Sequence, residues 1–207
     1  MAPLPEFKTD SAGYFWLKAS PGRGIKTSKG YVAVFVCLVV KAIHLEVVSD
    51  LTTDAFLAAY RRFVARRGLC QVLYSDNGTT LKGSEAELHR FFSETSATGQ
   101  AVAAAVASDG VEWRYIPPRA SNFGGIWESN VKSMKRHLYK VIGDSKLTYE
   151  QFSTVLASIE ASLISRPISA PSSDPNDVSA LTPGHFLIGK PLVALPEPYT
   201  EVNQRRK

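Results

Sequence analysis

The stretch Tyr31-Val-Ala-Val-Phe-Val-Cys-Leu-Val-Val40, followed after Lys41 by Ala42-Ile-His-Leu-Glu-Val-Val48, decides the fold class. The first run is apolar, rich in valine and short enough for a buried strand, and the second run is also β-prone. We therefore predict two adjacent strands of one sheet, joined at Lys41. The first run has ten residues, about half of the ~20 that a membrane-spanning helix needs, so no membrane partner is expected.

Strands and helices alternate after this pair. Apolar residues spaced three and four apart predict a helix that ends near Arg67, where Gly68 follows. Further on we predict a strand over residues 71–74, helical pieces within 82–108, a strand over 111–116, and helices over 126–142 and 148–165. This order indicates an α/β domain with a central mixed β-sheet and helices on both faces.

The composition is that of an ordinary globular protein. The chain has 207 residues, of which 44% are hydrophobic and 21% charged, which excludes disordered and disulfide-scaffold classes. Cys37 and Cys70 stand in apolar surroundings without the clustered ligands of a zinc site, so we predict buried thiols. A net charge of +5 favours a polyanionic partner only weakly.

Three acidic residues fall at the ends of predicted elements. Asp10 follows an extended segment, Asp76 follows the strand over 71–74, and Glu128 opens the helix over 126–142. Only the fold can bring them together, because they are far apart in sequence. Converging carboxylates are preferred ligands of Mg²⁺ or Mn²⁺, and two such ions about 3.5–4 Å apart support phosphoryl displacement. The chemistry predicted from such a cluster is phosphodiester transfer.

Longer motifs surround these acids. They are Tyr74-Ser-Asp-Asn-Gly-Thr-Thr80, Trp113-Arg-Tyr-Ile-Pro-Pro-Arg-Ala-Ser-Asn-Phe-Gly-Gly-Ile-Trp-Glu128 and Val131-Lys-Ser-Met-Lys-Arg136, supported by Lys41-Ala-Ile-His-Leu-Glu-Val-Val-Ser-Asp-Leu51, Ser165-Arg-Pro-Ile168 and Leu181-Thr-Pro-Gly-His-Phe-Leu-Ile-Gly189. Together they resemble the catalytic core of retroelement integrases, and among these most closely the BEL/Pao type. The resemblance spans about residues 7–190. It implies an RNase H-like fold, a D,D(51)E metal triad of Asp10, Asp76 and Glu128, and 3′-end processing and strand transfer of element DNA.

The same resemblance implies cofactors, partners and domain limits. Two Mg²⁺ or Mn²⁺ ions are expected when substrate is bound, double-stranded DNA from element ends and target is the expected partner, and a homo-oligomer is expected. The catalytic core would span 7–168, with an N-terminal segment 1–30 that carries the first strand and a basic turn, and a Pro/Ser-rich extension 169–207. Action on host DNA implies a nuclear location, and otherwise a cytoplasmic one. The first residues show no secretory signal.

The helix that Glu128 opens carries regularly spaced cations. Lys132 and Lys135 lie on the same helix face as Glu128. Arg136 and Lys140 repeat this pattern one position further along the helix. Residues at i+4 and i+7 share the face of residue i, so these side chains and Arg119 in the preceding loop are predicted to contact DNA phosphates. A solvated face over a buried apolar stripe is the alternative interpretation.

Glycine-containing turns adjoin two of the acids. Asn77 and Gly78 are predicted to shape the turn that directs Asp76, because glycine accepts a positive φ and asparagine bonds its own backbone. Gly124 and Gly125 are predicted to form a mobile loop beside the substrate. A purely structural turn and a plain connector are the respective alternatives.

Other polar and apolar features are interpreted as structural. His44 lies within a strand pattern and is interpreted as a hydrogen-bonded core histidine. The arginines at positions 61, 62, 66 and 67 are interpreted as compensation of a helix dipole and as solubilising charge. The apolar stripe of the helix over 148–165 is interpreted as core, with a subunit interface as the alternative.

Two other functions stay open at this level. The absence of flanking zinc and DNA-binding domains favours an isolated core or polyprotein fragment, and with it a catalytically silent or domesticated DNA-binding or assembly module. The presence of all three carboxylates favours activity. A simple RNase H-type nuclease is disfavoured by the sequence Phe123-Gly-Gly-Ile-Trp-Glu128. Fold alone does not decide between these functions.

Overall fold

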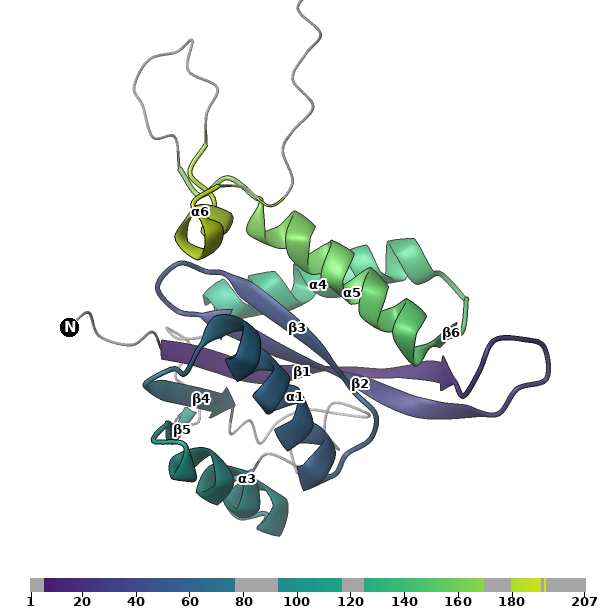
Figure 1. Ribbon diagram of the computed structural model, residues 1–207, viewed down its shortest axis with the longest axis horizontal. Helices are drawn as coiled ribbons and strands as arrows, with labels where there is room; N and C mark the ends of the chain where they lie inside the picture. The colour runs from purple at the N-terminus through teal and green to yellow at the C-terminus, as the bar shows by residue number, and fades with distance from the viewer. Residues whose placement is uncertain (1–5, 77–92, 117–124, 170–179, 191, 193–207) are drawn as a thin grey trace, which may run out of the picture.

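The computed structural model describes residues 6–76, 93–116, 125–169, 180–190 and 192, and gives only the backbone of residues 8–13, 76 and 125–128 (Figure 1). Its elements are β1 (Glu6–Lys18), β2 (Thr27–Cys37), β3 (Ile43–Val48), α1 (Thr53–Arg67), β4 (Val72–Asp76), α3 (Ala97–Ser108), β5 (Glu112–Ile116), α4 (Gly125–Ile142), β6 (Leu147–Thr148), α5 (Tyr149–Ile164) and α6 (Pro183–Ile188). No helix of the described residues is both long enough and apolar enough to cross a membrane.

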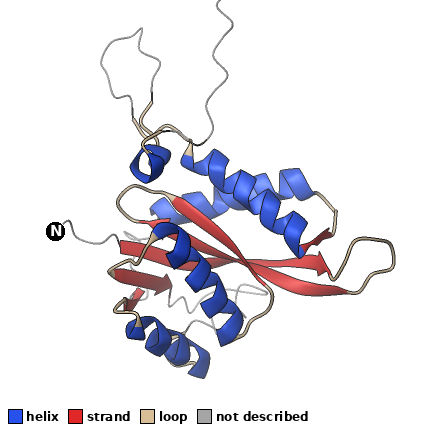
Figure 2. Cartoon of the chain, viewed as in Figure 1, coloured by secondary structure: helices blue, strands red, loops and turns tan. Residues whose placement is uncertain are grey.

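The strands form one mixed sheet in the order β3-β2-β1-β4-β5, with β6 paired to β1 (Figure 2). β1, β2 and β3 are antiparallel, whereas β4 and β5 continue the sheet in parallel with β1. Helices lie on both faces. Phe35 of β2 stacks on Phe63 of α1 at 4.3 Å between ring centroids, while Phe15 of β1 contacts Phe152 of α5 at 5.2 Å. The predicted mixed sheet with helices on both faces is confirmed.

The two strands that the apolar run predicted are present, but their boundary lies earlier. β2 begins at Thr27 and ends at Cys37, and residues 38–40 form a turn that Lys41 completes with φ 58°. Two backbone bonds close this turn, from Cys37 N to Ala42 O and from Lys41 N to Cys37 O. Val39 is consequently 71% exposed. Hydrophobicity alone misplaces this strand end, because the closing bonds come from the backbone.

β1 is longer than its sequence suggests. It continues through residues 12 and 13, where its pairing with β2 shifts register between Ser11 and Tyr14. A β-bulge accommodates the extra residue of β1, so Ala12 and Gly13 interrupt the pairing with β2 without ending the strand. β1 and β2 therefore form a long hairpin, and the predicted basic turn is reduced to the segment closed by the bond from Ala19 N to Lys26 O.

The core fills both sides of the sheet. The apolar stripe of α5 is buried against it, as predicted: Phe152, Leu156, Ile159 and Leu163. Cys37 and Cys70 are buried free thiols, also as predicted, and burial raises the pKa of Cys70 to about 11. α3 confirms the second helical piece expected within 82–108, and the first piece falls mostly outside the described residues.

Candidate active site

The parallel pairing of β1 with β4 places two of the predicted acids side by side. Thr9 pairs with Ser75, so Asp10 and Asp76 occupy the next positions on neighbouring strands. Neighbouring strands lie about 4.8 Å apart. Asp76 is the last residue of β4, at the carboxyl end of the strand, where α/β sheets commonly bind ligands.

α4 lies over the same face of the sheet as the register position of Asp10. Asp10 pairs with Val34, and Val34 shares a face of β2 with Gly30, because successive strand residues alternate. Gly30 pairs with Phe15, whose ring lies 6.1 Å from the ring of Tyr139 on α4. α4 begins at Gly125, so Glu128 stands in its first turn. The backbone thus sets Asp10 and Asp76 at neighbouring positions on the sheet face that α4 covers, and Glu128 stands in the first turn of that helix.

The carboxylates themselves lie outside the described part of the chain, as do Asn77, Gly78, Arg119 and Gly124. Within the residues that the structure describes, no group of three or more His, Cys, Asp or Glu side chains is placed to hold a metal ion. Gly125 differs from the prediction, because it is the first residue of α4 and not part of the loop. Glycine destabilises mainly the interior of a helix, so it is tolerated at this first position.

A buried hydrogen bond that the sequence did not predict fixes the start of α4. Asn130 is 2% exposed, and its Oδ1 accepts a bond of 2.5 Å from Arg166 Nη2, just beyond α5. Arg166 also donates through Nε to the carbonyl oxygen of Leu163 at 3.0 Å. Burial lowers the pKa of Arg166. Because Asn130 follows Glu128 by two residues, this bond anchors the turn that carries the third acid.

The cations of α4 divide into two environments. Lys132, Arg136 and Lys140 are exposed and make no ion pair with a described residue, whereas Lys135 is half-buried and has an interaction within the fold. Met134 and Leu138 are fully buried on the other side of the helix. The apolar stripe of the alternative interpretation is therefore present, and the exposed cations remain available above it.

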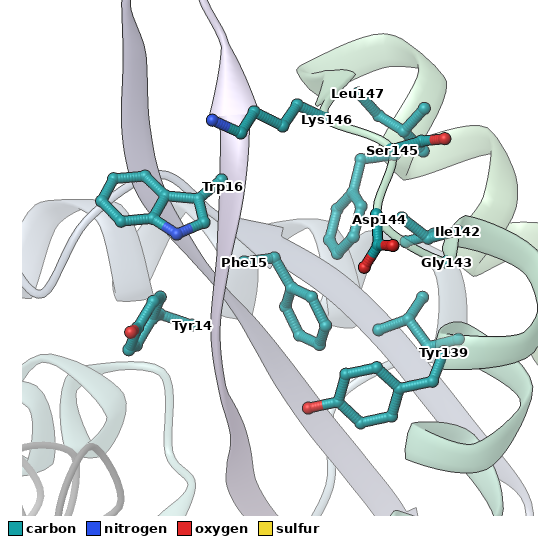
Figure 3. A pocket seen from close by; sticks show the side chains of 12 residues that line it. Tyr14, Phe15, Trp16, Tyr139, Ile142, Gly143, Asp144, Ser145, Lys146 and Leu147 are labelled. Carbon is teal, nitrogen blue, oxygen red and sulfur yellow. The ribbon is translucent and has the colours of Figure 1, made fainter.

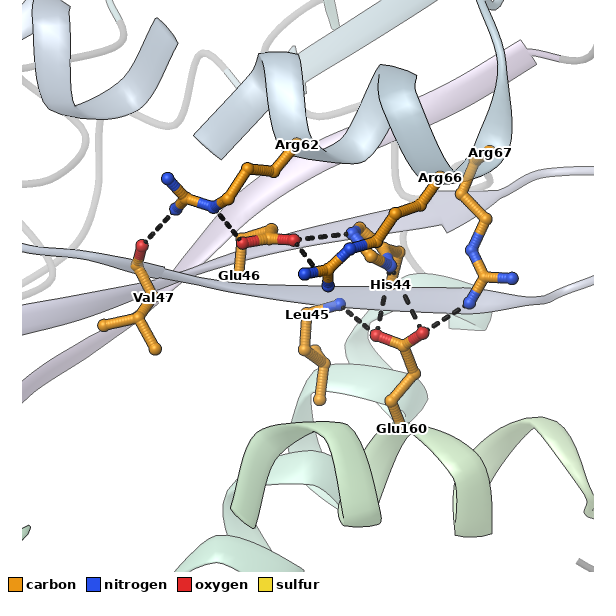
Figure 4. A network of polar contacts seen from close by, with 8 residues as sticks. All are labelled: His44, Leu45, Glu46, Val47, Arg62, Arg66, Arg67 and Glu160. Carbon is orange, nitrogen blue, oxygen red and sulfur yellow. Dashed lines mark hydrogen bonds and ion pairs between the residues drawn. The ribbon is translucent and has the colours of Figure 1, made fainter. Parts of the chain in front are cut away.

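A second charged cluster lies at β3, the edge strand of the sheet (Figure 4). Glu160 of α5 accepts bonds from Leu45 N at 2.8 Å and from Arg67 of α1. His44 lies between two carboxylates, with Nδ1 3.2 Å from Glu160 and Nε2 3.0 Å from Glu46. The cluster therefore connects the helices of the two faces around the free edge of the sheet.

Ion pairs set the protonation of this cluster. Burial alone would lower the pKa of His44, but its hydrogen bonds to Glu160 and Glu46 raise it. Burial would raise the pKa of each of these carboxyls, but the bonds from His44, together with Arg62 at Glu46 and the Leu45 amide at Glu160, lower it. His44 is a hydrogen-bonded core histidine, as predicted.

The arginines of α1 have a role that the sequence did not indicate. Arg62 Nε lies 2.5 Å and Arg66 Nη1 3.1 Å from the Glu46 carboxylate, and Arg67 pairs with Glu160. Their interpretation as compensation of the helix dipole is thus incomplete, because they neutralise buried acids on β3 and α5. No sequence signal identified Glu160 as their partner, since 93 positions separate it from Arg67.

Solved integrase catalytic cores have a similar structure. The HTLV-2 integrase catalytic core domain in complex with magnesium, in its trimeric form, matches with a TM-score of 0.56 and 16% identity over 89% of this chain and 97% of that chain. The dimeric form matches with a TM-score of 0.55 and 15% identity over 91% and 97%. A simian T-cell lymphotropic virus intasome in complex with the PP2A regulatory subunit B56 gamma matches at 0.56 and 14%, over 96% of this chain and 59% of that chain.

No family model and no curated protein matches the sequence. At 14% to 16% identity the structural similarity establishes the fold, and the class it defines is the RNase H-like fold of integrase catalytic cores. The fold that the resemblance implied is confirmed. The BEL/Pao type, the metal triad and the activity remain predictions.

Proposed function

We propose that this chain is the catalytic core of a BEL/Pao-type retrotransposon integrase, a metal-dependent polynucleotidyl transferase. It would trim the 3′ ends of element DNA and join them to target DNA. Asp10, Asp76 and Glu128 are proposed as the catalytic and metal-binding residues. The observation that carries this proposal is the register of β1 and β4, which sets Asp10 beside Asp76 on the sheet face that α4 covers.

The proposed donor set suits Mg²⁺ or Mn²⁺. All three residues offer carboxylate oxygens, which hard divalent cations prefer over nitrogen or sulfur. When bound, two such ions would activate the attacking oxygen and stabilise the leaving oxygen of a phosphodiester. The chain itself would position the three carboxylates. Asp10 lies within β1, Asp76 is the last residue of β4, and the Asn130–Arg166 bond anchors the turn of α4 that presents Glu128.

Substrate binding is assigned to the basic face of α4. Lys132, Arg136 and Lys140 are exposed along α4, whose first turn carries Glu128, so they would meet phosphates on either side of the reacting bond. Lys135 and Arg119 are proposed as further DNA contacts. We also propose that Asn77, Gly78 and Gly124 shape the loops beside the acids.

Assembly and location follow from the same proposal. The similar solved structures include dimeric and trimeric integrase cores and an intasome, which supports a homo-oligomer on double-stranded DNA. The core is proposed to span residues 7–168; it overlaps the N-terminal segment 1–30 and is followed by the extension 169–207. We propose a nuclear location when the protein acts on host DNA, and a cytoplasmic one otherwise.

A nicking assay tests the proposal. The chain is incubated with Mn²⁺ and a labelled duplex that imitates element ends, and wild type is compared with Asp76→Asn and Glu128→Gln. The matched controls are Asp54→Asn and Glu150→Gln, which alter acids in the first turns of α1 and α5. We expect nicking that requires the metal, is lost in both site variants and is retained in both controls. DNA retention without nicking would instead support a silent module, and cleavage confined to RNA·DNA hybrids would support a nuclease.

A further inference from the structure

Side chains of the central strands alternate between the two faces of the sheet, and packing against the helices identifies each face. On β1, Phe15 lies on the side of Tyr139 and α4, whereas Tyr14 and Trp16 lie on the other side of the strand (Figure 3). The position of Asp10 shares the face of Phe15, as the register with β2 showed. Any side chain that meets substrate beside the proposed acids must therefore belong to the α4 face.

Arg114 of β5 lies on this face. The residue before it points the other way, because Trp113 meets Phe56 of α1 edge to face at 6.1 Å between ring centroids. Successive residues of a strand alternate, so Arg114 belongs to the face opposite α1. It pairs with Tyr74 of β4, and Asp76 follows Tyr74 by two positions on the same face. With strands about 4.8 Å apart and a rise of about 3.3 Å per residue, the positions of Arg114 and Asp76 lie about 8 Å apart.

Two neighbouring side chains hold the guanidinium of Arg114. Glu112 accepts one bond from Nε and one from Nη2, each at 2.7 Å. The hydroxyl oxygen of Tyr74 accepts a longer bond of 3.5 Å from Nη1. The bonds from Arg114 lower the pKa of Glu112, so this carboxylate stays ionised at neutral pH. A guanidinium that is already oriented loses less rotamer freedom when it binds a ligand.

The guanidinium still has donors for a further acceptor. Of its five N–H groups, two are directed at Glu112 and one at Tyr74, which leaves one on Nη1 and one on Nη2. The side chain of Arg114 is 48% exposed, so a ligand can reach this edge. Two parallel N–H donors match two oxygens of one phosphate group. Arg114 is also the one Lys or Arg among the residues of β4 and β5.

We propose that Arg114 binds a phosphate of the DNA strand beside the reacting bond, and that Glu112 and Tyr74 are positioning residues that orient its guanidinium. The proposal rests on the proposed function for the location of the reacting bond. At ~3.4 Å per nucleotide of one strand, the separation of about 8 Å corresponds to about two nucleotides from the metal site. α4 packs on β1, whereas β5 is an edge strand beyond β4. The cations of α4 and Arg114 would therefore hold DNA on two sides of the Asp10 and Asp76 positions.

DNA binding without metal tests Arg114 separately from catalysis. Fluorescence anisotropy in EDTA measures the affinity of the chain for a labelled blunt duplex over a range of salt concentrations. Arg114→Ala is expected to weaken binding about tenfold, the scale of one hydrogen bond to a charged group, and to lower the salt slope by about one phosphate contact. Arg114→Lys keeps the charge without the fork, so it should restore the salt slope and only part of the affinity. Arg66→Ala is the matched control, because Arg66 is likewise exposed and paired with a glutamate but belongs to α1, and it should change the affinity less than about twofold.

Glu112→Ala tests the positioning role by the sign of its effect. If Glu112 only repels DNA, removal of its negative charge tightens binding. If it orients Arg114, its removal weakens binding although the chain becomes more basic, and this is the expected result. Tighter binding by Glu112→Ala would overturn the positioning role.

Two results would overturn the phosphate contact itself: a loss of less than about twofold in Arg114→Ala, or an equal loss in Arg66→Ala. An exposed ion pair contributes little to stability, so an unchanged Tm is expected and confirms that the variants fold. Nicking by the wild type together with unchanged DNA affinity in Arg114→Ala would overturn this proposal alone. Failure of the nicking assay together with the expected losses of affinity would overturn the proposed function and leave the contact with DNA in place.

Discussion

Glutamine in place of Glu160 keeps the shape of the side chain but removes its charge. The carboxylate of Glu160 receives His44 Nδ1, Leu45 N and Arg67, and the side chain is only 13% exposed. Removing one member of a buried ion pair costs about 3–5 kcal/mol, because the remaining charges lose their partner without regaining water. The amide oxygen of glutamine can still accept one bond, so we expect a loss of about 3 kcal/mol in the free energy of unfolding.

Urea denaturation measures this loss. The midpoint should fall while the slope m stays constant, since the substitution changes stability and not the surface exposed on unfolding. Glu150→Gln is the matched control on the same helix, and its exposed side chain predicts a change within about 0.5 kcal/mol. A loss below about 1 kcal/mol for Glu160→Gln would refute the reasoning, because the cluster would then contribute no more than a surface ion pair.

Three further predictions concern stability and activity. The pKa of His44 in the folded protein lies above its ordinary 6.5. The stabilisation that the protonated imidazole provides is therefore complete below about pH 6.5 and is lost as the pH rises through the folded pKa. Unfolding free energies measured against pH should show this decline, and His44→Gln should abolish the decline. Arg166→Ala leaves the amide of Asn130 buried without its partner, so we expect about 1–3 kcal/mol of destabilisation and a lower nicking rate, and unchanged rate and stability would contradict the anchoring role. Gly30→Ala puts a Cβ 2.3 Å from Cδ1 of the buried Leu17, and thermal unfolding should report a loss of about 1–3 kcal/mol.

The sequence predicted what depends on local pattern. The valine-rich run predicted the adjacent strands β2 and β3, and the apolar spacing predicted the buried stripe of α5 that includes Phe152 and Leu163. The order of strands and helices was enough to predict a mixed sheet covered on both faces. Boundaries were less predictable: β2 ends at Cys37 because backbone bonds close the turn, although the apolar run continues to Val40.

Features that depend on distant pairing could not be predicted from one sequence. Glu160 meets His44 across 116 positions, and Arg166 meets Asn130 across 36. Phe15 of β1 meets Tyr139 only because β1 extends past its bulge to reach the end of α4. For the candidate site, sequence motifs named the acids, and the register of β1 with β4 supplied the physical reason why two of them can act together.

Crystals of the chain soaked in manganese test the central claim most directly, because anomalous scattering locates the ion without reference to any activity. The account predicts a Mn²⁺ peak between Asp10 and Asp76, within coordination distance of their carboxylates, and its loss in Asp76→Asn crystals. An intact backbone register with no ion at this position, or an unchanged peak in the variant, would contradict it.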